Sequence, residues 1–464
     1  MEARREADVA IVGGGLAGLM AARTVAAAGL EPVVLEARDR VGGRIVNAPV
    51  GGGAVVEMGG QWVAHRDERL RALLGELGLE MFPVWDRGRH LIELDRGVRR
   101  YRGSVPRIRP RTLIDVARAR LKLDRAAKRV PAVAPWEADR ASEWDATVVS
   151  EWFDENVRTA AARELLDAAI ATIWGEDPHG VNMLAALAFI NTAGSFDGLS
   201  ATRGGLLQDR VVGGSARLAD AMAAELGDRV VYEAPVDAVL DRGSSVEVEA
   251  AGVRVVARRA VVAVPPSLAL DIRFEPALPA PHRRALESLP LGSVIKIAAV
   301  YERPFWRDRG LSGRAVTVSG PITSTIDNSP PDGRPGVLVG FSPGRRAREL
   351  RQRPEAERRE AVLAAFARLF GDEAARPDDY IEQDWSAERW TDGCYFGLPG
   401  RGVMTTLSPT FGTPFGSIHW AGTETAFGSY GGMDGALISG ERAAGEAVAA
   451  LSGERRLSPA AAAP

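Results

Sequence analysis

The chain has 464 residues, which predicts two domains, and its 46% hydrophobic and 26% charged residues are ordinary for a globular protein with a large core. A formal net charge of −3 gives no excess of cations for nucleic acid, and no run approaches the ~20 apolar residues that cross a bilayer. The one cysteine, Cys394, excludes a disulfide within the chain and a zinc site built from cysteines.

The first 36 residues predict a strand–helix–strand unit. Val9–Val12 is a short apolar run, typical of a buried parallel strand. Leu16–Ala28 predicts a helix that Gly29 ends, and Val33–Leu35 predicts the second strand. The charged segment Met1–Ala7 lacks the layout of a signal peptide, so we expect a cytoplasmic protein.

The remaining segments change character along the chain. Residues 83–204 are rich in Trp and Arg and predict several helices. Short strands follow, such as Val230–Tyr232 and Ala260–Val264. Two later helices are predicted around Glu355–Leu369 and over Gly432–Ala450.

This alternation predicts an α/β fold with a Rossmann-like domain and a mixed α+β substrate domain inserted into it discontinuously. We assign residues 1–82, 205–290 and 386–452 to the nucleotide-binding domain, and residues 83–204 and 291–385 to the substrate-binding domain. The Ala- and Pro-rich end, 453–464, is expected to be a disordered tail.

A glycine-rich turn joins the first predicted strand to the first helix. Gly13–Gly18 has the pattern G-x-G-x-x-G, in which Gly13 permits the tight turn and Gly15 lets the backbone approach a pyrophosphate. Gly18 allows the helix and strand to pack closely, and the helix N-terminus offers N–H donors. Glu36 follows the second strand and can accept hydrogen bonds from ribose hydroxyls. A glycine turn without a ligand is the alternative, and the motif does not separate FAD from NAD.

Three further motifs resemble those of the flavin amine oxidase family, and within it the monoamine oxidases. Glu36–Arg44 resembles the second FAD fingerprint, in which Arg44 would pair with phosphate or shield the flavin edge. Gly59–Trp62 resembles the segment that runs under the isoalloxazine ring. Trp420–Thr425 followed by Gly431–Ala436 resembles the closing signature, where a loop and a helix N-terminus meet the flavin. The motifs occur in family order and reach both ends of the chain.

The resemblance implies FAD as the cofactor. The residues that it places at FAD belong to these motifs, to a middle segment and to the cysteine loop: Gly13, Gly15, Leu16, Ala17, Gly18, Glu36, Ala37, Gly43, Arg44, Gly59, Gly60, Gln61, Trp62, Val236, Cys394, Gly422, Thr423, Glu424, Gly432 and Met433. Five scattered histidines have no metal-like spacing, so we expect no metal.

Lys296 is one of only three lysines in the chain and lies in an apolar run, Val294–Val300. Burying an ammonium group is costly without a partner. Lys296 resembles a lysine of this family that holds a water near flavin N5. A compact ammonium suits that task better than a planar guanidinium. The alternative is a lysine that extends from a sheet edge into solvent.

Cys394 lies in the sequence Asp392-Gly393-Cys394-Tyr395. It resembles the monoamine oxidase Gly-Gly-Cys-Tyr, whose sulfur is joined to the 8α carbon of the flavin. The resemblance therefore implies covalent FAD, and attachment through a thiolate predicts a lowered thiol pKa. Asp392 replaces the first glycine, which matters little if only Gly393 makes the turn. A free buried thiol beside a noncovalent flavin is the alternative.

Tyr395 resembles one wall of the aromatic cage that flanks the substrate amine in this family. The second wall falls on Gly432, so either Tyr430 swings in or the cage is half open. Ser324 stands where the family has a bulky tyrosine, and we expect a wide pocket that accepts a bulkier or longer amine. The other pocket residues that the resemblance implies are Trp62, Phe341 and Ile173. Trp385 resembles a family tryptophan near the flavin, with ordinary core packing as the alternative.

The resemblance implies an FAD-dependent amine oxidase that converts an amine to an imine, with O2 reduced to H2O2. Its expected catalytic residues are Lys296, Tyr395 and Trp385. Two alternatives remain: a flavin-dependent desaturase or oxidase of a larger apolar substrate, and a flavin-binding protein without catalysis. We expect a small-molecule amine and O2 as partners, no nucleic acid and no membrane span. By base rate, a homodimer is the commonest oligomer.

Overall fold

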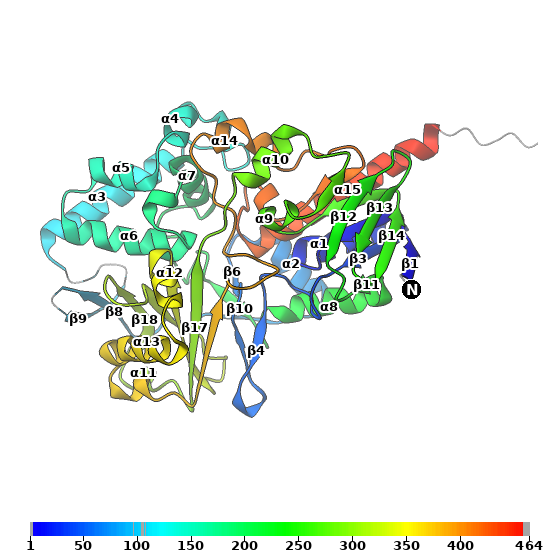
Figure 1. The fold of residues 1–464 in the computed structure, drawn as a ribbon. Coiled ribbons are helices and arrows are strands. Elements are labelled where there is room, and N and C mark those ends of the chain that lie inside the picture. Colours follow the sequence, from blue (N-terminus) through cyan, green and yellow to red (C-terminus); the bar gives the residue numbers. More distant parts are fainter. Residues whose placement is uncertain (1–2, 96, 104–105, 107, 458–464) are drawn as a thin grey trace, which may run out of the picture.

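The computed structural model describes residues 3–457 apart from 96, 104–105 and 107 (Figure 1). One half of the molecule has a central five-stranded sheet in the order β11-β3-β2-β15-β22, in which every neighbouring pair is parallel. Its strands come from three separated parts of the chain: β2 (Val9–Val12), β3 (Pro32–Leu35), β11 (Val230–Val231), β15 (Arg259–Val262) and β22 (Ile418–Trp420). All residues of β2 and β3 are buried, as continuous apolar runs predict.

Helices cover one face of this sheet and a second sheet covers the other. The helices are α1 (Leu16–Ala27), α8 (Ala216–Leu226) and α15 (Met433–Leu457). The second sheet has the order β1-β14-β13-β12-β16, with strands β1 (Ala3–Glu6), β12 (Val236–Asp241), β13 (Val246–Ala250), β14 (Val253–Ala257) and β16 (Arg273–Glu275). Gly440 brings α15 against α1, because a Cβ there would lie 2.2 Å from the Ala17 carbonyl oxygen.

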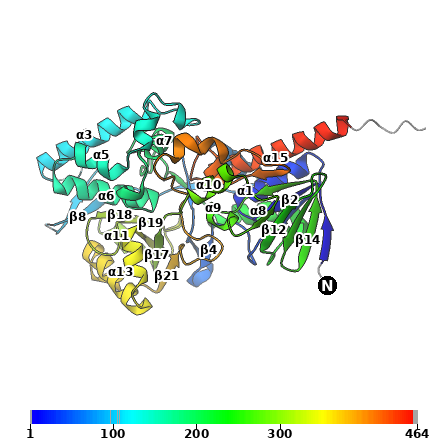
Figure 2. The ribbon, with the colours of Figure 1, turned by 45° about the horizontal axis from the view of Figure 1, so that its top comes forward.

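A seven-stranded sheet forms the other half of the molecule, in the order β21-β17-β20-β19-β18-β8-β9. Its strands are β8 (Arg89–Leu94), β9 (Gly97–Tyr101), β17 (Val294–Tyr301), β18 (Leu311–Thr317), β19 (Ser324–Asp327), β20 (Gly336–Pro343) and β21 (Asp379–Asp384). Figure 2 shows this sheet between α13 (Glu355–Phe370) and a layer of helices. That layer contains α3 (Pro110–Ala127), α4 (Ala141–Asp145), α5 (Val149–Asn156), α6 (Ala160–Trp174) and α7 (Met183–Thr192).

The remaining strands and helices are short. They are β4 (Asn47–Pro49), β5 (Val55–Glu57), β6 (Trp62–Val63), β7 (Met81–Pro83), β10 (Asp209–Val211), α2 (Glu68–Glu76), α9 (Pro266–Ala269), α10 (Ala280–Glu287), α11 (Phe305–Asp308), α12 (Arg345–Arg351) and α14 (Val403–Thr406). Strands β6, β10 and β7 form a small antiparallel sheet, and β4 pairs with β5.

Two features differ from the sequence-based expectation. The region 83–204 contains β8 and β9 as well as helices, because both strands complete the edge of the seven-stranded sheet. The predicted tail began at residue 453, but α15 continues to Leu457, so that boundary was wrong; 458–464 lie outside the described residues. Within the described part of the chain, no helix is long and apolar enough to cross a membrane.

Candidate active site

A cavity of about 1050 Å³ runs from the central parallel sheet to the seven-stranded sheet. Every residue predicted for the cofactor, catalysis or the substrate lines it, with two exceptions, Gly18 and Glu424. Gly18 lies behind the turn, where a Cβ would be 1.9 Å from the Gly13 carbonyl oxygen. It therefore allows the close helix–strand packing that the motif predicts, without contacting the cavity.

The N-terminus of α1 faces this cavity. Gly15 is its N-cap residue, and no side chain caps the first turn. A Cβ at Gly15 would meet nothing within 4 Å, so the backbone here borders open space. Leu16 and Ala17 also line the cavity, which leaves the unpaired N–H groups of the first turn available to an anion. This arrangement fits the diphosphate of a dinucleotide.

Glu36 is fixed at the end of β3. Its carboxylate accepts hydrogen bonds from the backbone N–H of Gly14 at 2.7 Å and of Arg38 at 3.0 Å. Only 3% of Glu36 is exposed, yet it lines the cavity close to the glycine turn. Its position suits an acceptor for ribose hydroxyls.

Arg44 forms a partly buried ion pair with Glu424. The guanidinium donates to the two carboxylate oxygens of Glu424 at 2.6 and 3.1 Å, and to the carbonyl oxygen of Tyr395 at 3.0 Å. Burial alone would lower the pKa of Arg44, but Glu424 raises it overall. Arg44 also lines the cavity, so its expected contact with phosphate or with the flavin edge stays a prediction. Glu424 positions Arg44 and does not reach the cavity itself.

Lys296 projects from β17 into the cavity and is only 3% exposed. Its ammonium nitrogen Nζ donates to the carbonyl oxygen of Gly59 at 2.9 Å and to Oε1 of Gln61. The rings of Trp62 and Phe341 contact each other with centroids 5.9 Å apart, and these centroids lie 5.7 and 5.8 Å from Nζ. The expected alternative, a lysine reaching solvent from a sheet edge, is wrong because β17 lies between β20 and β21.

A chain of buried side-chain amides links Lys296 to an ion pair. Nε2 of Gln61 donates to Oδ1 of Asn328, and Nδ2 of Asn328 donates to Glu57 at 3.2 Å. Glu57 in turn forms an ion pair with Arg210, and both side chains are at most 6% exposed. Burial lowers the pKa of Lys296 to about 7; Glu57 opposes this shift and Arg210 adds to it. Lys296 is therefore able to exchange a proton near neutral pH.

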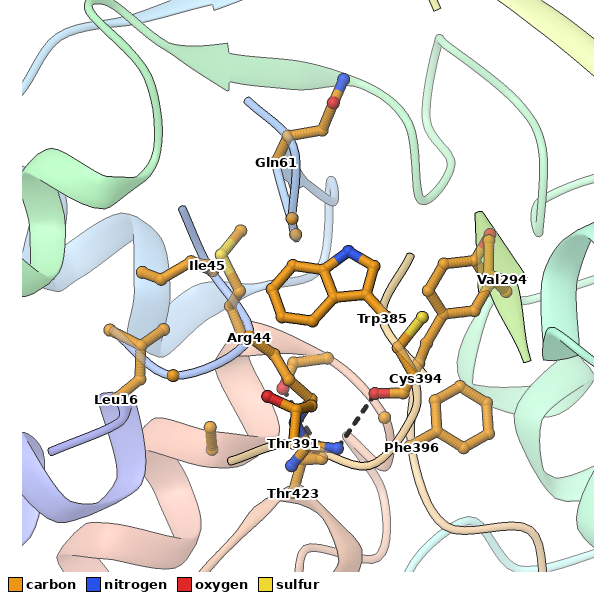
Figure 3. Close-up of a pocket in the computed structure, with 18 of the residues that line it drawn as sticks. Leu16, Arg44, Ile45, Gln61, Val294, Trp385, Thr391, Cys394, Phe396 and Thr423 are labelled. Atoms are coloured by element: carbon orange, nitrogen blue, oxygen red, sulfur yellow. Dashed lines mark hydrogen bonds between the residues drawn. The ribbon is translucent and has the colours of Figure 1, made fainter. Parts of the chain in front are cut away.

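The cysteine loop packs tightly against two glycines. The backbone N–H of Cys394 donates to the carbonyl oxygen of Gly292 at 3.0 Å. A Cβ on Gly175 or Gly292 would lie 3.0 or 2.6 Å from the Cys394 carbonyl oxygen, so neither position accommodates a side chain without movement. In Figure 3, Cys394 lies beside Trp385, whose indole N–H donates to the Met58 carbonyl oxygen at 3.0 Å.

Two expectations about this loop need correction. Both Asp392 and Gly393 have positive φ, at 59° and 136°, so the turn requires a left-handed conformation at Asp392 as well as at Gly393. The pKa of the Cys394 thiol is raised and not lowered, because burial outweighs the opposing effects of Arg44 and Lys296.

The aromatic cage is half open. Tyr430 does not swing toward the position of the missing ring, because its hydroxyl donates to the Gly397 carbonyl oxygen at 2.5 Å and its ring stacks on Phe427 at 5.7 Å. Gly432 is exposed to the cavity, and a Cβ there would be no closer than 3.8 Å to its nearest neighbour, the carbonyl oxygen of Ser429. Position 432 therefore contributes no side chain to the cavity.

The substrate half of the cavity lies between the seven-stranded sheet and helices α6 and α7. Phe341 and Ser324 are cross-strand partners on β20 and β19, and Phe341 is also the partner of Lys296. Ile173 lines the opposite wall from α6. The structure thus brings the predicted substrate residues to the same cavity as Lys296 and Tyr395.

Several residues of this site were not found from the sequence. Glu57, Arg210 and Asn328 carry no local motif and meet only after folding. Gly175 and Gly292 were missed because their sequence surroundings indicate only ordinary turns. Within the described residues, no group of three or more His, Cys, Asp or Glu side chains could hold a metal ion.

Comparisons with known proteins agree with this arrangement. Residues 16–448 match the family of flavin-containing amine oxidoreductases. The chain is 37% identical to putrescine oxidase of Kocuria rosea over 97% of both chains, and 34% identical to flavin-containing amine oxidase B of Sus scrofa over 96% of this chain and 86% of the relative. A solved structure of putrescine oxidase bound to putrescine has 34% identity and a TM-score of 0.92, covering 96% of this chain and 100% of that one. The predicted fold class is confirmed, and the chain belongs to the flavin-containing amine oxidoreductase family.

Proposed function

We propose that the protein is an FAD-dependent oxidase of amines. A primary amine loses two electrons and two protons to become an imine, and O2 takes up both to form H2O2. Water then converts the imine to an aldehyde or ketone and releases ammonia. The chemistry that FAD supplies is the acceptance of two electrons from the amine and their transfer to O2.

One observation carries the proposal. The same cavity joins the uncapped N-terminus of α1 to Lys296, Trp385, Cys394 and Tyr395, which come from distant parts of the chain. The end of the cavity at α1 suits a dinucleotide, and the end with these four side chains suits an amine beside a flavin ring. A dinucleotide-binding protein without redox chemistry would not need a buried lysine with a pKa near 7 at this position.

The residues of the chain have distinct roles in this proposal. The backbone of Leu16 and the first turn of α1 holds the diphosphate, and Glu36 holds the ribose. Tyr395 orients the amine, and apolar side chains such as Phe341 exclude water, so that the amine binds in its neutral form. Lys296 holds a water through Nζ and exchanges a proton with it. A separate general base is not required when the amine enters deprotonated.

We further propose that Cys394 is joined to FAD through its sulfur. Cys394 is the only cysteine in the chain, it lines the cavity, and two positive charges, Arg44 and Lys296, favour its thiolate. The raised pKa of the thiol opposes attachment, since the thiolate is the nucleophile. We therefore expect attachment to be slow at neutral pH and to accelerate as the pH rises.

The width of the cavity supports a bulky or long amine. Gly432 and Ser324 both face the cavity, where larger side chains would narrow it. The desaturase alternative draws on the same open space, but it does not account for Lys296 and Tyr395 beside Cys394.

Stoichiometry tests this function. An oxygen electrode, a peroxide assay and carbonyl analysis on one reaction are expected to give one O2 consumed, one H2O2 formed and one carbonyl product per amine. A desaturase would consume O2 and form peroxide without releasing ammonia or an aldehyde from the substrate.

A further inference from the structure

Arg314 lies at the far end of the substrate cavity. Lys296, Phe341, Ser324 and Val316 are successive cross-strand partners on β17, β20, β19 and β18. Neighbouring strands are ~4.8 Å apart, which places Val316 roughly 14 Å from Lys296 across the sheet. Arg314 precedes Val316 by two residues, next to a register shift between Leu311 and Ala315, and both Arg314 and Val316 line the cavity.

The guanidinium of Arg314 has no anionic partner in the described part of the chain. Its Nη2 donates to the carbonyl oxygen of Ser200 at 2.8 Å, and no described carboxylate lies within 4 Å of it. The nearby Asp86 is held by Arg203 through two hydrogen bonds, at 2.6 and 3.0 Å. Burial lowers the pKa of Arg314, although Tyr101 and Asp86 favour the charged form. Arginine stays charged at any physiological pH, so this end of the cavity carries an uncompensated positive charge.

The other charges of the cavity reinforce this asymmetry. Glu36, Asp67, Asp237, Asp271 and Asp434 line the cavity outside residues 83–204 and 291–385. Among the described residues within these two ranges, the only carboxylate that lines it is Asp197, which forms an ion pair with Arg120. A second ammonium group on a substrate would therefore meet Arg314 without a free carboxylate to accept it. A carboxylate group would instead gain a charge-assisted, potentially bidentate hydrogen bond from Arg314.

We propose that Arg314 forms a subsite for a carboxylate at the far end of the substrate, so that the preferred amines are amino carboxylates with a long spacer. The amine group lies at Tyr395 and Lys296, and the carboxylate lies at Arg314. This inference rests on the proposed amine oxidation.

Three substrates of equal length test the proposal: octylamine, 8-aminooctanoate and 1,8-diaminooctane. They differ only in a distal methyl, carboxylate or ammonium group. We measure the kcat/KM of the flavin-containing enzyme for each by peroxide formation. The wild type is expected to favour 8-aminooctanoate over the diamine by at least about tenfold, the effect of one charged contact. R314M is expected to abolish this preference, and R314E to reverse it in favour of the diamine.

R66M is the matched control. Arg66 also lines the cavity, but it is exposed to solvent. Its removal changes the net charge as R314M does and is expected to retain the preference for the carboxylate. Equal loss in both variants would overturn the subsite, because it would indicate a general field of positive charge. Octanoate, which cannot be oxidised, is expected to inhibit octylamine oxidation competitively in the wild type and at least about tenfold more weakly in R314M.

The outcomes separate the two proposals. Equal kcat/KM for all three substrates would overturn the subsite and leave amine oxidation standing. If none of the three substrates yields peroxide, and none bleaches a flavin that dithionite reduces, both the subsite and the proposed function fail.

Discussion

Lys296 is the residue whose protonation the structure ties most directly to catalysis. Burial lowers its pKa to about 7, so Nζ is charged below neutral pH and increasingly neutral above it. The rate at which O2 reoxidises the reduced enzyme is therefore expected to change with an apparent pKa near 7. K296M is expected to remove this step from the pH profile measured by stopped flow. A step near pH 7 that persists in K296M would contradict the assignment.

The effect of Glu57 on the pKa of Lys296 gives a second test of the role of Lys296. Its negative charge raises the pKa of Lys296 and is linked to it through Gln61 and Asn328. E57Q removes the charge, so the midpoint of the same pH step is expected to move to lower pH. An unchanged midpoint would show that the buried amide chain does not influence Lys296.

The proposed bond to Cys394 is expected to keep FAD attached when the protein is denatured. Acid precipitation of the wild type is expected to give a yellow pellet, while C394A releases all its flavin into the supernatant. Because the thiol pKa is raised, covalent incorporation of FAD into apoprotein is expected to be faster at pH 9 than at pH 7. These two pH values lie on either side of about 8.5, the pKa of an unperturbed thiol. Complete release of flavin from the wild type would contradict the linkage.

Gly432 controls the width of the amine site. A Cβ at this position meets no neighbour closer than 3.8 Å, so G432Y is expected to fold and to place a ring opposite Tyr395. The variant should lose kcat/KM for bulky amines and gain it for a small arylalkylamine. G432A is the control and should change neither by more than about twofold, since one methyl group alters contacts little. Unchanged selectivity in G432Y would show that the empty space does not limit the substrate.

At the scale of elements, the contact between α1 and α15 holds the cofactor end of the cavity. A Cβ on Gly440 would lie 2.2 Å from the backbone oxygen of Ala17, so G440A forces the helices apart. We expect a loss of about 1–3 kcal/mol in the free energy of unfolding, and weaker flavin retention. G445A lies on the same helix with nothing within 4 Å and should stabilise by roughly 0.5–1 kcal/mol. Denaturant titration of both variants measures these changes in the free energy of unfolding. Equal free energies for G440A and G445A would contradict the prediction.

The sequence predicted those parts of the fold in which local geometry restricts residue choice. Gly13 and Gly15 were placed at the cofactor turn because a tight turn and a close backbone approach require glycine there. The partner of Arg44 was not predicted, since Glu424 is 380 residues away and the pairing exists only after folding. Strand β8 was missed because its pairing with β18 also depends on tertiary structure.

The same reasoning explains the errors at individual residues. The pKa of Cys394 depends on burial, which its four-residue motif does not reveal, and the outcome was opposite to the expectation. The anchoring of Tyr430 depends on Phe427 and on the backbone of Gly397. The motifs therefore predicted residues that line the cavity. They did not predict the pKa of Cys394 or the side-chain position of Tyr430.

At the scale of the whole molecule, the cavity joins segments from the full length of the chain. Its walls include α1 near the beginning, β17 in the middle and the N-terminus of α15 near the end. The division into 1–82, 205–290 and 386–452 against 83–204 and 291–385 remains our proposal for the two domains. Within it, a bound flavin would contact both and connect them.

Anaerobic flavin reduction is the most direct test of this account. The purified holoprotein is mixed with a series of primary, secondary and longer-chain amines while the flavin absorbance at about 450 nm is recorded. We predict that at least one class of amine bleaches the flavin, and that admitting air restores the colour and yields peroxide. If dithionite reduces the flavin but no amine does, the assignment of amine oxidation to this cavity is contradicted.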